Sequence, residues 1–558
     1  MLTLARLPRW QAWRRAPCQA GRQAHRHRAP SRCYSVRVPD SSIRTVAELR
    51  AWKPEVDVPH VEVCGWVRSV RKSSGVWFVD ITDGSSMRPL QAVVDKAKSG
   101  DIRPGTAVRL KGTLKELVKE PLKRKHHADT DRHVSNTPSS SSSSDALDPL
   151  AVDGPAIGAG RTTHELRVDD VDILGSSDPR TYPIQNKYET SESLRTKSHL
   201  RWRTPLNATL LRLRSDAIAV LTDFFSGQKF QQTHPPVITS ANCEGAGEAF
   251  TVKADGPADF FKGPKYLTVS SQLHLEALAQ ALGNVWTLSP TFRAEPSDTS
   301  RHLSEFYMLE AEMSFVRDMG DVMDLVQSML RALAVGLRQR HAATELRVNR
   351  MDSRDPAERL AFADLAAEDE LGRRWRGLLS PETWPRITYT EALARLQAVA
   401  GRFEHKPAWS GGLQTEHEKY LAEQLGYDKA QDAVLPVFVT HYPRDVKAFY
   451  MLPSSSPPPQ GQTVDCFDLL VPALGELVGG SMREHRLPEL EDSIRRHAKD
   501  YPQAAEDDME WYLDLRRWGC PPHGGFGLGL DRLLSYLTGV PSVRDVVPFP
   551  RHLGRCDC

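Results

Sequence analysis

The spacing of apolar and polar residues changes along the chain and separates regions of different structure. Over residues 61–114, apolar positions alternate with polar ones or form short runs that end at turns such as Asp83-Gly84-Ser85, a pattern typical of β-strands. Strand character returns over residues 164–175. Short strands joined by tight turns predict a small β-barrel. We expect its strands at residues 61–66, 76–81, 90–94, 107–112, 164–168 and 171–175.

Residues 118–163 interrupt the strand pattern. A basic run at residues 123–127 is followed by a serine tract at residues 139–144, and apolar residues are few. A segment of this composition cannot bury a core, so we predict a disordered insert between two barrel strands. The basic run fits a solvated loop, and contact with RNA phosphates is the alternative.

From residue 206 onward the pattern becomes a mixture of helices and strands. Apolar residues recur at helical spacing over residues 206–228 and again over residues 320–341. A strand is expected to start at Pro235-Pro236. The polar stretch at residues 176–205 is interpreted as a linker or hinge between the barrel and this mixed region.

Composition excludes several classes of protein. The 558 residues suggest two to four domains, and 40% apolar with 26% charged residues is ordinary for a globular protein. No apolar run approaches the roughly 20 residues that span a bilayer, which excludes a transmembrane protein. The eight cysteines include no CxxC pair, so neither a disulfide scaffold nor a cysteine-rich zinc site is expected.

The net charge of +2 conceals an uneven distribution. Residues 1–39 contain nine Arg and no Asp, Glu or Lys, which predicts a mitochondrial transit peptide, with a basic nucleic-acid-binding arm as the alternative. The remaining chain has 64 basic and 71 acidic residues. Any nucleic acid must therefore be held by local basic patches rather than by the field of the whole protein.

Two segments carry residues suited to nucleotide chemistry. In the first, Arg293 and Glu295 are two apart on a predicted strand and therefore share one face, and Arg301-His302-Leu303-Ser304-Glu305-Phe306 follow. Arginine binds phosphate through two parallel bonds, and a glutamate accepts from an exocyclic amine. In the second, the glycines of residues 524–529 allow close approach of a ligand, and Arg532 opens a helix.

Together these segments resemble motifs 2 and 3 of the class II aminoacyl-tRNA synthetases. The region of Phe230 and Pro235-Pro236 resembles motif 1, which implies a homodimer. The barrel resembles the OB-fold anticodon-binding module of the aspartate, asparagine and lysine subgroup. The implied fold is α+β, an N-terminal OB-fold β-barrel followed by a catalytic domain with an antiparallel sheet flanked by helices. Composition, residue pattern and this resemblance together give the expected bounds, which are 1–39 for the transit peptide, 58–175 for the barrel with its insert at 118–163, 176–205 for the linker and 206–558 for the catalytic domain.

Within this subgroup the chain is most similar to the asparagine-specific branch. Aspartate-specific members have a lysine three residues after the position of Gln272, where this chain has Leu275. Loss of that cation favours a neutral amide over a carboxylate. Aspartate specificity and an inactive RNA-binding paralogue remain alternatives. The segments that carry the similarity are 243–248, 268–276, 447–451, 468–472, 475–481 and 511–516.

The resemblance implies that asparagine and ATP form asparaginyl-adenylate, which then acylates tRNA(Asn) for mitochondrial translation, with Mg²⁺ as cofactor. Catalysis is expected from Arg293, Arg532 and Glu476. The residues implied for ATP are Arg293, Glu295, Arg301, His302, Leu303, Phe306, Glu476, Gly529 and Arg532. Those implied for the amino acid are Glu244, Gln272, Arg293, Gly479 and Arg483. The residues implied for Mg²⁺ are Asp468 and Glu476. Those implied for the anticodon are Phe78 and Gln91.

Some of these residues have a plain structural interpretation as well. Glu305, Glu310 and Glu312 fit ion pairs, His302 fits a loop hydrogen bond, and Phe78 fits the barrel core. The chain also departs from the family pattern, because Asp531 stands where motif 3 usually has Glu and Pro296 where motif 2 usually has Asn.

Overall fold

The computed structural model describes residues 43–117, 163–240, 249–254, 256, 260–352, 356–500 and 509–558. The predictions for the transit peptide, for nearly all of the insert and for Glu244 concern residues outside this set. No helix among the described residues is long and apolar enough to cross a membrane.

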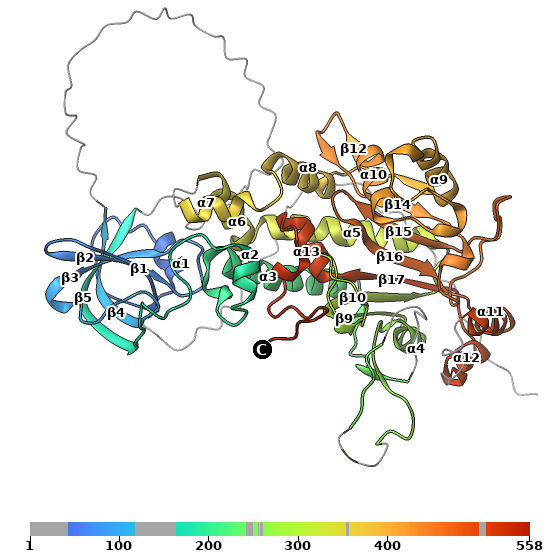
Figure 1. Ribbon diagram of the computed structural model, residues 1–558, viewed down its shortest axis with the longest axis horizontal. Helices are drawn as coiled ribbons and strands as arrows, with labels where there is room; N and C mark the ends of the chain where they lie inside the picture. The colour runs from blue at the N-terminus through green and yellow to red at the C-terminus, as the bar shows by residue number, and fades with distance from the viewer. Residues whose placement is uncertain are drawn as a thin grey trace, which may run out of the picture. The chain divides into compact units, whose positions relative to one another are not determined.

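The described residues 58–116 and 164–175 form a closed barrel of five strands in the order β1-β2-β3-β5-β4 (Figure 1). Its interior is filled by alternate strand residues such as Val79 and Ile81, which are fully buried because successive side chains point to opposite faces of a strand. Helix α1 (Val46–Ala51) adds Val46 and Leu49 to this core. The strands are β1 (Val58–Lys72), β2 (Val76–Thr82), β3 (Leu90–Asp95), β4 (Ala107–Glu116) and β5 (His164–Gly175).

An eight-stranded sheet forms the centre of the second region, in the order β11-β14-β15-β16-β17-β10-β9-β6. Neighbouring strands are antiparallel, except for the short outer pairs β11–β14 and β6–β9. The strands are β6 (Gln231–Gln232), β9 (Asn284–Phe292), β10 (Glu305–Ser314), β11 (Arg386–Thr388), β14 (Val437–Thr440), β15 (Cys466–Val471), β16 (Gly475–Met482) and β17 (His523–Gly529). The predicted α+β fold, with a barrel followed by an antiparallel sheet, is confirmed.

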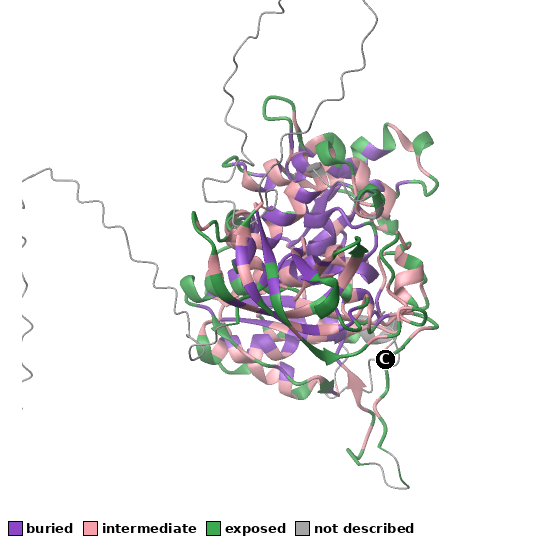
Figure 2. Ribbon diagram, turned by 90° about the vertical axis from the view of Figure 1, so that its left-hand side faces the viewer, coloured by how far each residue is buried: buried purple, intermediate pink, exposed green. Residues whose placement is uncertain are grey.

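Helices pack on this sheet, and Figure 2 shows the buried residues concentrated along its strands and in these helices. The two predicted helices are present as α3 (Pro205–Gly227) and α5 (Met319–Arg338). The others are α2 (Ser191–Arg195), α4 (Gln272–Leu282), α6 (His341–Asp352), α7 (Pro356–Ala363), α8 (Glu368–Leu379), α9 (Tyr389–Gln397), α10 (Thr415–Gly426), α11 (Leu487–Asp500), α12 (Glu510–Arg517) and α13 (Leu530–Thr538). Two small strand pairs complete the set, β7 (Ile238–Thr239) with β8 (Tyr266–Leu267) and β12 (Tyr427–Asp428) with β13 (Ala433–Val434).

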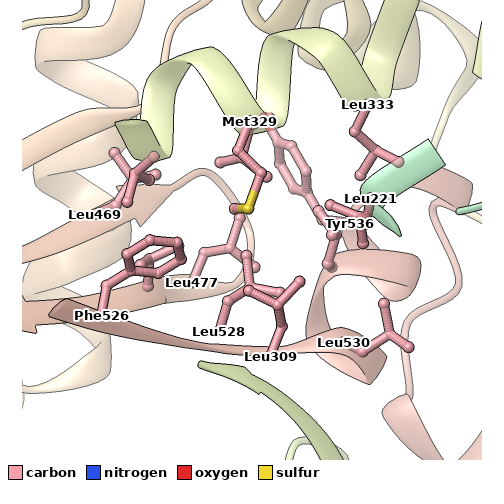
Figure 3. Packing of buried hydrophobic residues seen from close by; sticks show 14 of the residues in the cluster. Leu221, Leu309, Met329, Leu333, Leu469, Leu477, Phe526, Leu528, Leu530 and Tyr536 are labelled. Atoms are coloured by element: carbon pink, nitrogen blue, oxygen red, sulfur yellow. The ribbon is translucent and has the colours of Figure 1, made fainter. Parts of the chain in front are cut away.

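The main hydrophobic core lies between one face of the sheet and helices α3, α5 and α13. Met329 and Leu333 of α5 pack over Leu309, Phe526 and Leu528 of the central strands (Figure 3). Because side chains alternate along a strand, the neighbours of these core residues point to the other face of the sheet. On β10 and β17 those neighbours are Met308, Glu310, Glu312, Gly525 and Gly527.

The stretch interpreted as a linker, residues 176–205, is tied to the second region through arginines. Arg201 is 1% exposed and donates hydrogen bonds to the carbonyl oxygens of Arg544 and Val547. Arg195 of α2 forms a bidentate pair with Asp545, with nitrogen–oxygen distances of 2.6 and 2.8 Å. Two arginine anchors therefore fix the end of this stretch.

Candidate active site

Two adjoining cavities lie over the face of the sheet that is turned away from the main core. The first, of about 260 Å³, is called the glutamate cavity here and is lined by Glu310, Glu312 and Glu476 among others. The second, of about 140 Å³, is called the arginine cavity and is lined by Arg293, Arg301 and Arg532 among others. Both cavities are bordered by Arg293, Met308, Glu476 and Gly527. A ligand in one cavity would therefore meet a ligand in the other at these shared residues.

The glycines of β17 create the space for these cavities. A Cβ atom on Gly525 would lie 2.1 Å from Oε2 of Glu312, and one on Gly527 would lie 3.0 Å from the terminal methyl of Met308. The intervening residues Phe526 and Leu528 point into the core. The glycine-rich segment is thus a strand. One of its faces carries apolar side chains, and the other is bare because its residues there are glycines.

The arginine cavity concentrates positive charge. Arg301 donates to the Leu474 carbonyl oxygen at 2.7 Å and to Thr415, and Arg532 donates to the Glu476 carbonyl oxygen at 3.3 Å. Burial, followed by the nearby charge of Arg532, lowers the pKa of Arg301. Converging guanidinium groups repel one another, so a polyanion bound between them would be strongly stabilised.

The same cavity has an aromatic and an acidic wall. The guanidinium carbon of Arg293 lies 5.7 Å from the ring centre of Phe306, and an Arg293 nitrogen lies 3.9 Å from a Glu295 carboxylate oxygen. His302 places Nε2 3.4 Å from Glu295 and Nδ1 3.1 Å from Ser297 Oγ. Burial lowers the pKa of His302. His302 is therefore both a cavity residue and the loop hydrogen-bonding group of the alternative interpretation.

In the glutamate cavity, charged groups are paired within the protein. Arg483 bonds Glu312 through Nε and Nη2, the latter at 2.9 Å, and donates from Nη1 to Ser481 Oγ at 2.6 Å. The pair is buried, with side-chain exposures of 4% and 1%. Burial alone would lower the pKa of Arg483, but the charge of Glu312 raises it above its usual value. Arg483 is therefore a fixed cation, and Glu312 does form the predicted ion pair.

Glu310 has a different partner. Its carboxylate accepts from the backbone N–H of Ser271 at 2.9 Å and from the hydroxyl of Ser270. These two residues immediately precede α4, on which Gln272 lines the glutamate cavity. Glu310 thus holds the start of the helix that carries Gln272.

The donor set at the junction of the cavities is suited to a magnesium ion. A Cβ atom on Gly479 would lie 2.9 Å from Oε1 of Glu476 and 3.7 Å from Oδ1 of Asp468, so the two carboxylates approach one bare backbone position. Nζ of Lys447 lies 2.7 and 2.9 Å from the Asp468 oxygens. Among the described residues no group of three or more His, Cys, Asp or Glu side chains is arranged to hold a metal. Magnesium needs only one or two protein carboxylates when phosphates supply the rest, so these residues fit it.

On the barrel, Phe78 and Gln91 share the outer face of neighbouring strands. Arg71 lies across from Phe78, with its guanidinium carbon 5.6 Å from the ring centre, and donates to Gln91 Oε1 at 2.8 Å. Gln91 Nε2 donates to Glu165 Oε2 at 2.9 Å. Phe78 is half-buried and does not belong to the hydrophobic cluster that the described barrel residues form. A cation, an aromatic ring and an amide therefore lie side by side on the barrel surface.

Comparison with known protein families agrees with this arrangement. The sequence profile described as tRNA synthetases class II (D, K and N) matches residues 190–553, and the profile described as OB-fold nucleic acid binding domain matches residues 61–123. The chain belongs to the class II tRNA synthetases. The predicted family and the predicted OB-fold are both confirmed.

Individual relatives span nearly the whole of this synthetase. It is 37% identical to the mitochondrial asparagine–tRNA ligase of Schizosaccharomyces pombe, over 88% of this chain and 94% of the relative. It is also 37% identical to the asparaginyl-tRNA synthetase of Mus musculus, over 89% and 91% of the two chains. The crystal structure of asparaginyl-tRNA synthetase from Pyrococcus horikoshii complexed with asparaginyl-adenylate matches with a TM-score of 0.67 at 26% identity, over 90% of this chain and 97% of that one.

The departure at Asp531 in this synthetase has a structural counterpart. Asp531 is 3% exposed, pairs with Arg214 of α3 and accepts from the backbone N–H of Tyr307 at 3.1 Å. It thereby fixes the first turn of α13 to α3 and β10. Arg532, the next residue, is left to face the arginine cavity.

Sequence reasoning missed Glu418 of α10. Its Oε2 accepts from the Glu476 N–H at 3.2 Å, and burial together with the charges of Glu476 and Asp468 raises its pKa to about 7. Nothing in the local sequence marks Glu418, because α10 lies some fifty residues before the strands it supports. Lys447 was noticed only as part of a similar segment, without its pairing to Asp468.

Proposed function

We propose that this synthetase is an asparagine–tRNA ligase. The supporting observation is the buried Arg483–Glu312 pair in the glutamate cavity, which offers N–H donors and a carboxylate acceptor side by side. A carboxamide has a carbonyl oxygen for the first and an NH₂ group for the second. An aspartate carboxylate in the same position would meet Glu312 without a proton to share, and like charges in a buried site are strongly unfavourable.

Another lining residue of the glutamate cavity agrees with this choice. Leu275 is 1% exposed and lines the glutamate cavity, where the aspartate-specific pattern would supply a lysine. The relatives named as asparagine–tRNA ligases, among them the S. pombe protein, also support it. A site built to bond an amide rejects an analogue that leaves its polar groups unpaired.

In the first step a carboxylate oxygen of asparagine attacks the α-phosphorus of ATP, a new oxygen–phosphorus bond forms, and pyrophosphate leaves. Arg293 borders both cavities, so it is assigned to the α-phosphate and the attacking carboxylate.

Arg532 is assigned to the γ-phosphate, with Arg301 and His302 on the phosphate side. Phe306 stacks on adenine, Glu295 accepts from its amine, and Leu303 and Gly529 complete this pocket. The residues act by positioning and by charge stabilisation.

Asp468 and Glu476 would hold the magnesium ion. Bound there, the ion would neutralise phosphate charge and orient the triphosphate. Gly479 leaves the space between the two carboxylates. Burial raises the pKa of Asp468, and the charge of Lys447 opposes this rise while its hydrogen bonds orient the carboxylate. Gln272 and Glu244 are assigned to the α-ammonium of the amino acid.

In the second step the terminal ribose hydroxyl of tRNA attacks the acyl carbon, and AMP leaves. The outer face of the barrel is assigned to the anticodon, with Phe78 stacking on a base and Gln91 bonding its edge. The composition of residues 1–39 and the S. pombe relative support import into mitochondria. The motif 1 region, where Phe230 packs 5.3 Å from Phe225 between ring centres, is assigned to a homodimer interface.

Pyrophosphate exchange with the full chain tests the function. We expect ATP-dependent exchange to be supported by asparagine far better than by aspartate. Stronger exchange with aspartate would reassign the substrate. No exchange with any amino acid would identify an inactive paralogue.

A further inference from the structure

A fully buried glutamate lies one helical turn behind Gln272. Glu276 of α4 has no exposed surface and is surrounded by four donors. The distances to its carboxylate oxygens are 2.6 Å from Arg516 Nη2, 2.8 Å from Tyr512 Oη, 3.1 Å from His523 Nε2 and 3.1 Å from Gln272 Nε2. No step of the mechanism above uses it.

The surroundings keep Glu276 ionised. Burial alone would raise its pKa, but the charge of Arg516 and the hydrogen bond from His523 reverse this and hold the pKa below its usual range. Burial likewise opposes the charge on His523, but hydrogen bonds with Cys520 and Glu276 raise its pKa to about 10. Nδ1 of His523 lies 2.9 Å from the Pro521 carbonyl oxygen, so both ring nitrogens face acceptors.

An ionised carboxylate fixes the polarity of the amide that it contacts. It can only accept hydrogen bonds, so it must face the NH₂ end of Gln272. The other end of the amide, Oε1, is then turned away from Glu276. Because Gln272 lines the glutamate cavity, that oxygen is presented as an acceptor beside the position assigned to the amino-acid substrate.

We propose that Glu276 is a positioning residue, which locks the amide of Gln272 so that its oxygen receives the α-ammonium group of the amino acid. The proposal rests on the proposed function for the identity of the amino acid. It assigns Glu276 no contact with the substrate. Tyr512, Arg516 and His523 serve to keep the carboxylate charged and stationary.

Glu276→Gln tests this, because a glutamine at 276 can donate as well as accept and no longer dictates which way Gln272 turns. A hydrogen bond to a charged group is involved, so we expect KM for asparagine in pyrophosphate exchange to rise about 10-fold or more. KM for ATP should stay within about 2-fold of wild type, since the arginine cavity is untouched. Equal rises in both constants would indicate general damage and overturn the proposal.

A double-mutant cycle identifies the route of the effect. Gln272→Met removes the amide, and Glu276→Gln should add nothing to the KM for asparagine in that background. Effects that multiply would show that Glu276 acts independently of Gln272 and would overturn the proposal. Should Glu276→Gln fail to fold, Glu276→Asp replaces it, because it keeps the buried negative charge but draws the carboxylate back by one methylene and so weakens its contact with Gln272. The expected direction is the same, and an unchanged KM for asparagine would contradict the proposal.

Succinamate, which is asparagine without its α-amino group, isolates the contact. Its inhibition constant against asparagine should be the same within about 2-fold for wild type and Glu276→Gln, since it has no ammonium to lose a bond. An inhibition constant that rises as much as the KM for asparagine would overturn the assignment to the ammonium. Failure of the proposed function is a separate outcome, seen as absence of asparagine-dependent exchange in the wild-type protein.

Discussion

The glutamate cavity and the arginine cavity share a wall but differ in how their charges are balanced. In the glutamate cavity, Arg483 is paired with Glu312 and Lys447 with Asp468, so these two cations have their anions inside the protein. In the arginine cavity, Arg301 donates to the Leu474 carbonyl oxygen and to Thr415, Arg532 donates to the Glu476 carbonyl oxygen, and burial together with the charge of Arg532 lowers the pKa of Arg301.

This difference matches the two ligands that we propose for the cavities, asparagine and ATP. Asparagine is a zwitterion with a neutral side chain, so its recognition needs fixed polar groups, and the internally paired Arg483 and Glu312 can supply them. ATP brings several negative charges, which would complement the guanidinium groups of Arg301 and Arg532, since the protein groups to which these two donate are uncharged. Removal of a cation should therefore damage the fold on the glutamate side and damage catalysis on the arginine side.

Arg532→Ala should have the largest catalytic effect. We expect exchange to fall about 10³-fold, the range seen when a preorganised charge-stabilising donor is removed, with tRNA binding largely intact. Filter binding of tRNA and the exchange assay measure the two properties. Arg402→Ala, at an exposed position outside both cavities, is the control and should change neither. Loss of tRNA binding with normal exchange would contradict the assignment of Arg532.

Arg483→Met should have the largest effect on stability. It leaves Glu312 as an uncompensated buried charge, at a cost of about 3–5 kcal/mol in the free energy of unfolding. Urea unfolding should show this loss, while Arg532→Ala should unfold close to wild type. If Arg483→Met and Arg532→Ala lower the free energy of unfolding equally, the proposed difference in charge pairing between the two cavities is wrong.

The paired replacement sharpens the same test. Arg483→Met with Glu312→Leu removes both charges, and replacing a buried ion pair by apolar groups is often neutral. We expect stability to return while asparagine-dependent exchange does not. If the double variant still activates asparagine, the Arg483–Glu312 pair is not needed to recognise the substrate.

Phe78→Ala should act on tRNA alone. Loss of one stacked base costs about 1–3 kcal/mol, so we expect kcat/KM for tRNA charging to fall about 10- to 100-fold. Pyrophosphate exchange without tRNA should be unchanged, because Phe78 lies on the barrel surface. Tyr427→Ala, an aromatic residue that is 50% exposed on β12, is the matched control. Equal damage to both activities would argue against an anticodon role.

The periodic parts of the fold could be predicted because one face of each element is buried. The helical spacing of Leu210, Leu213 and Leu221 placed α3 to within a residue, and the apolar run that ends before the turn at residues 83–85 placed β2. The resemblance of the motifs to a family also brought together residues that line the two cavities. Arg293 and Arg532, 239 positions apart in the sequence, do border the arginine cavity.

The contacts between side chains from distant elements of the site could not be predicted. Glu418 contacts Glu476 from α10, and Glu276 meets Arg516 and His523 from two other elements. No local spacing encodes such contacts. They depend on which strands become neighbours in the fold and on which buried charged side chains then need a partner of opposite charge. The glycines of residues 524–529 predict close approach of a ligand, and only strand pairing shows that they belong to β17 and that their bare face makes the cavity.

The smallest expected effect concerns Glu418, behind the wall that the two cavities share. Its pKa is raised to about 7 by burial and by the charges of Glu476 and Asp468. A carboxyl group whose pKa is higher when folded than when unfolded stabilises the fold while it is protonated, and this advantage is lost as the pH rises from about 4.5 through about 7. Glu418→Gln cannot ionise, so its free energy of unfolding relative to wild type should increase by about 2 kcal/mol between pH 5 and pH 8.

Glu416→Gln, on the same helix, is the matched control for this titration. Backbone hydrogen bonding from His405 lowers the pKa of Glu416, so its contribution is present above the unfolded pKa and is lost only as the pH falls below that range. The difference between Glu416→Gln and wild type should therefore stay constant from pH 5 to pH 8 in urea unfolding. If Glu418→Gln behaves in the same way, Glu418 is already ionised at pH 5, and the junction of the two cavities carries a third negative charge throughout this range.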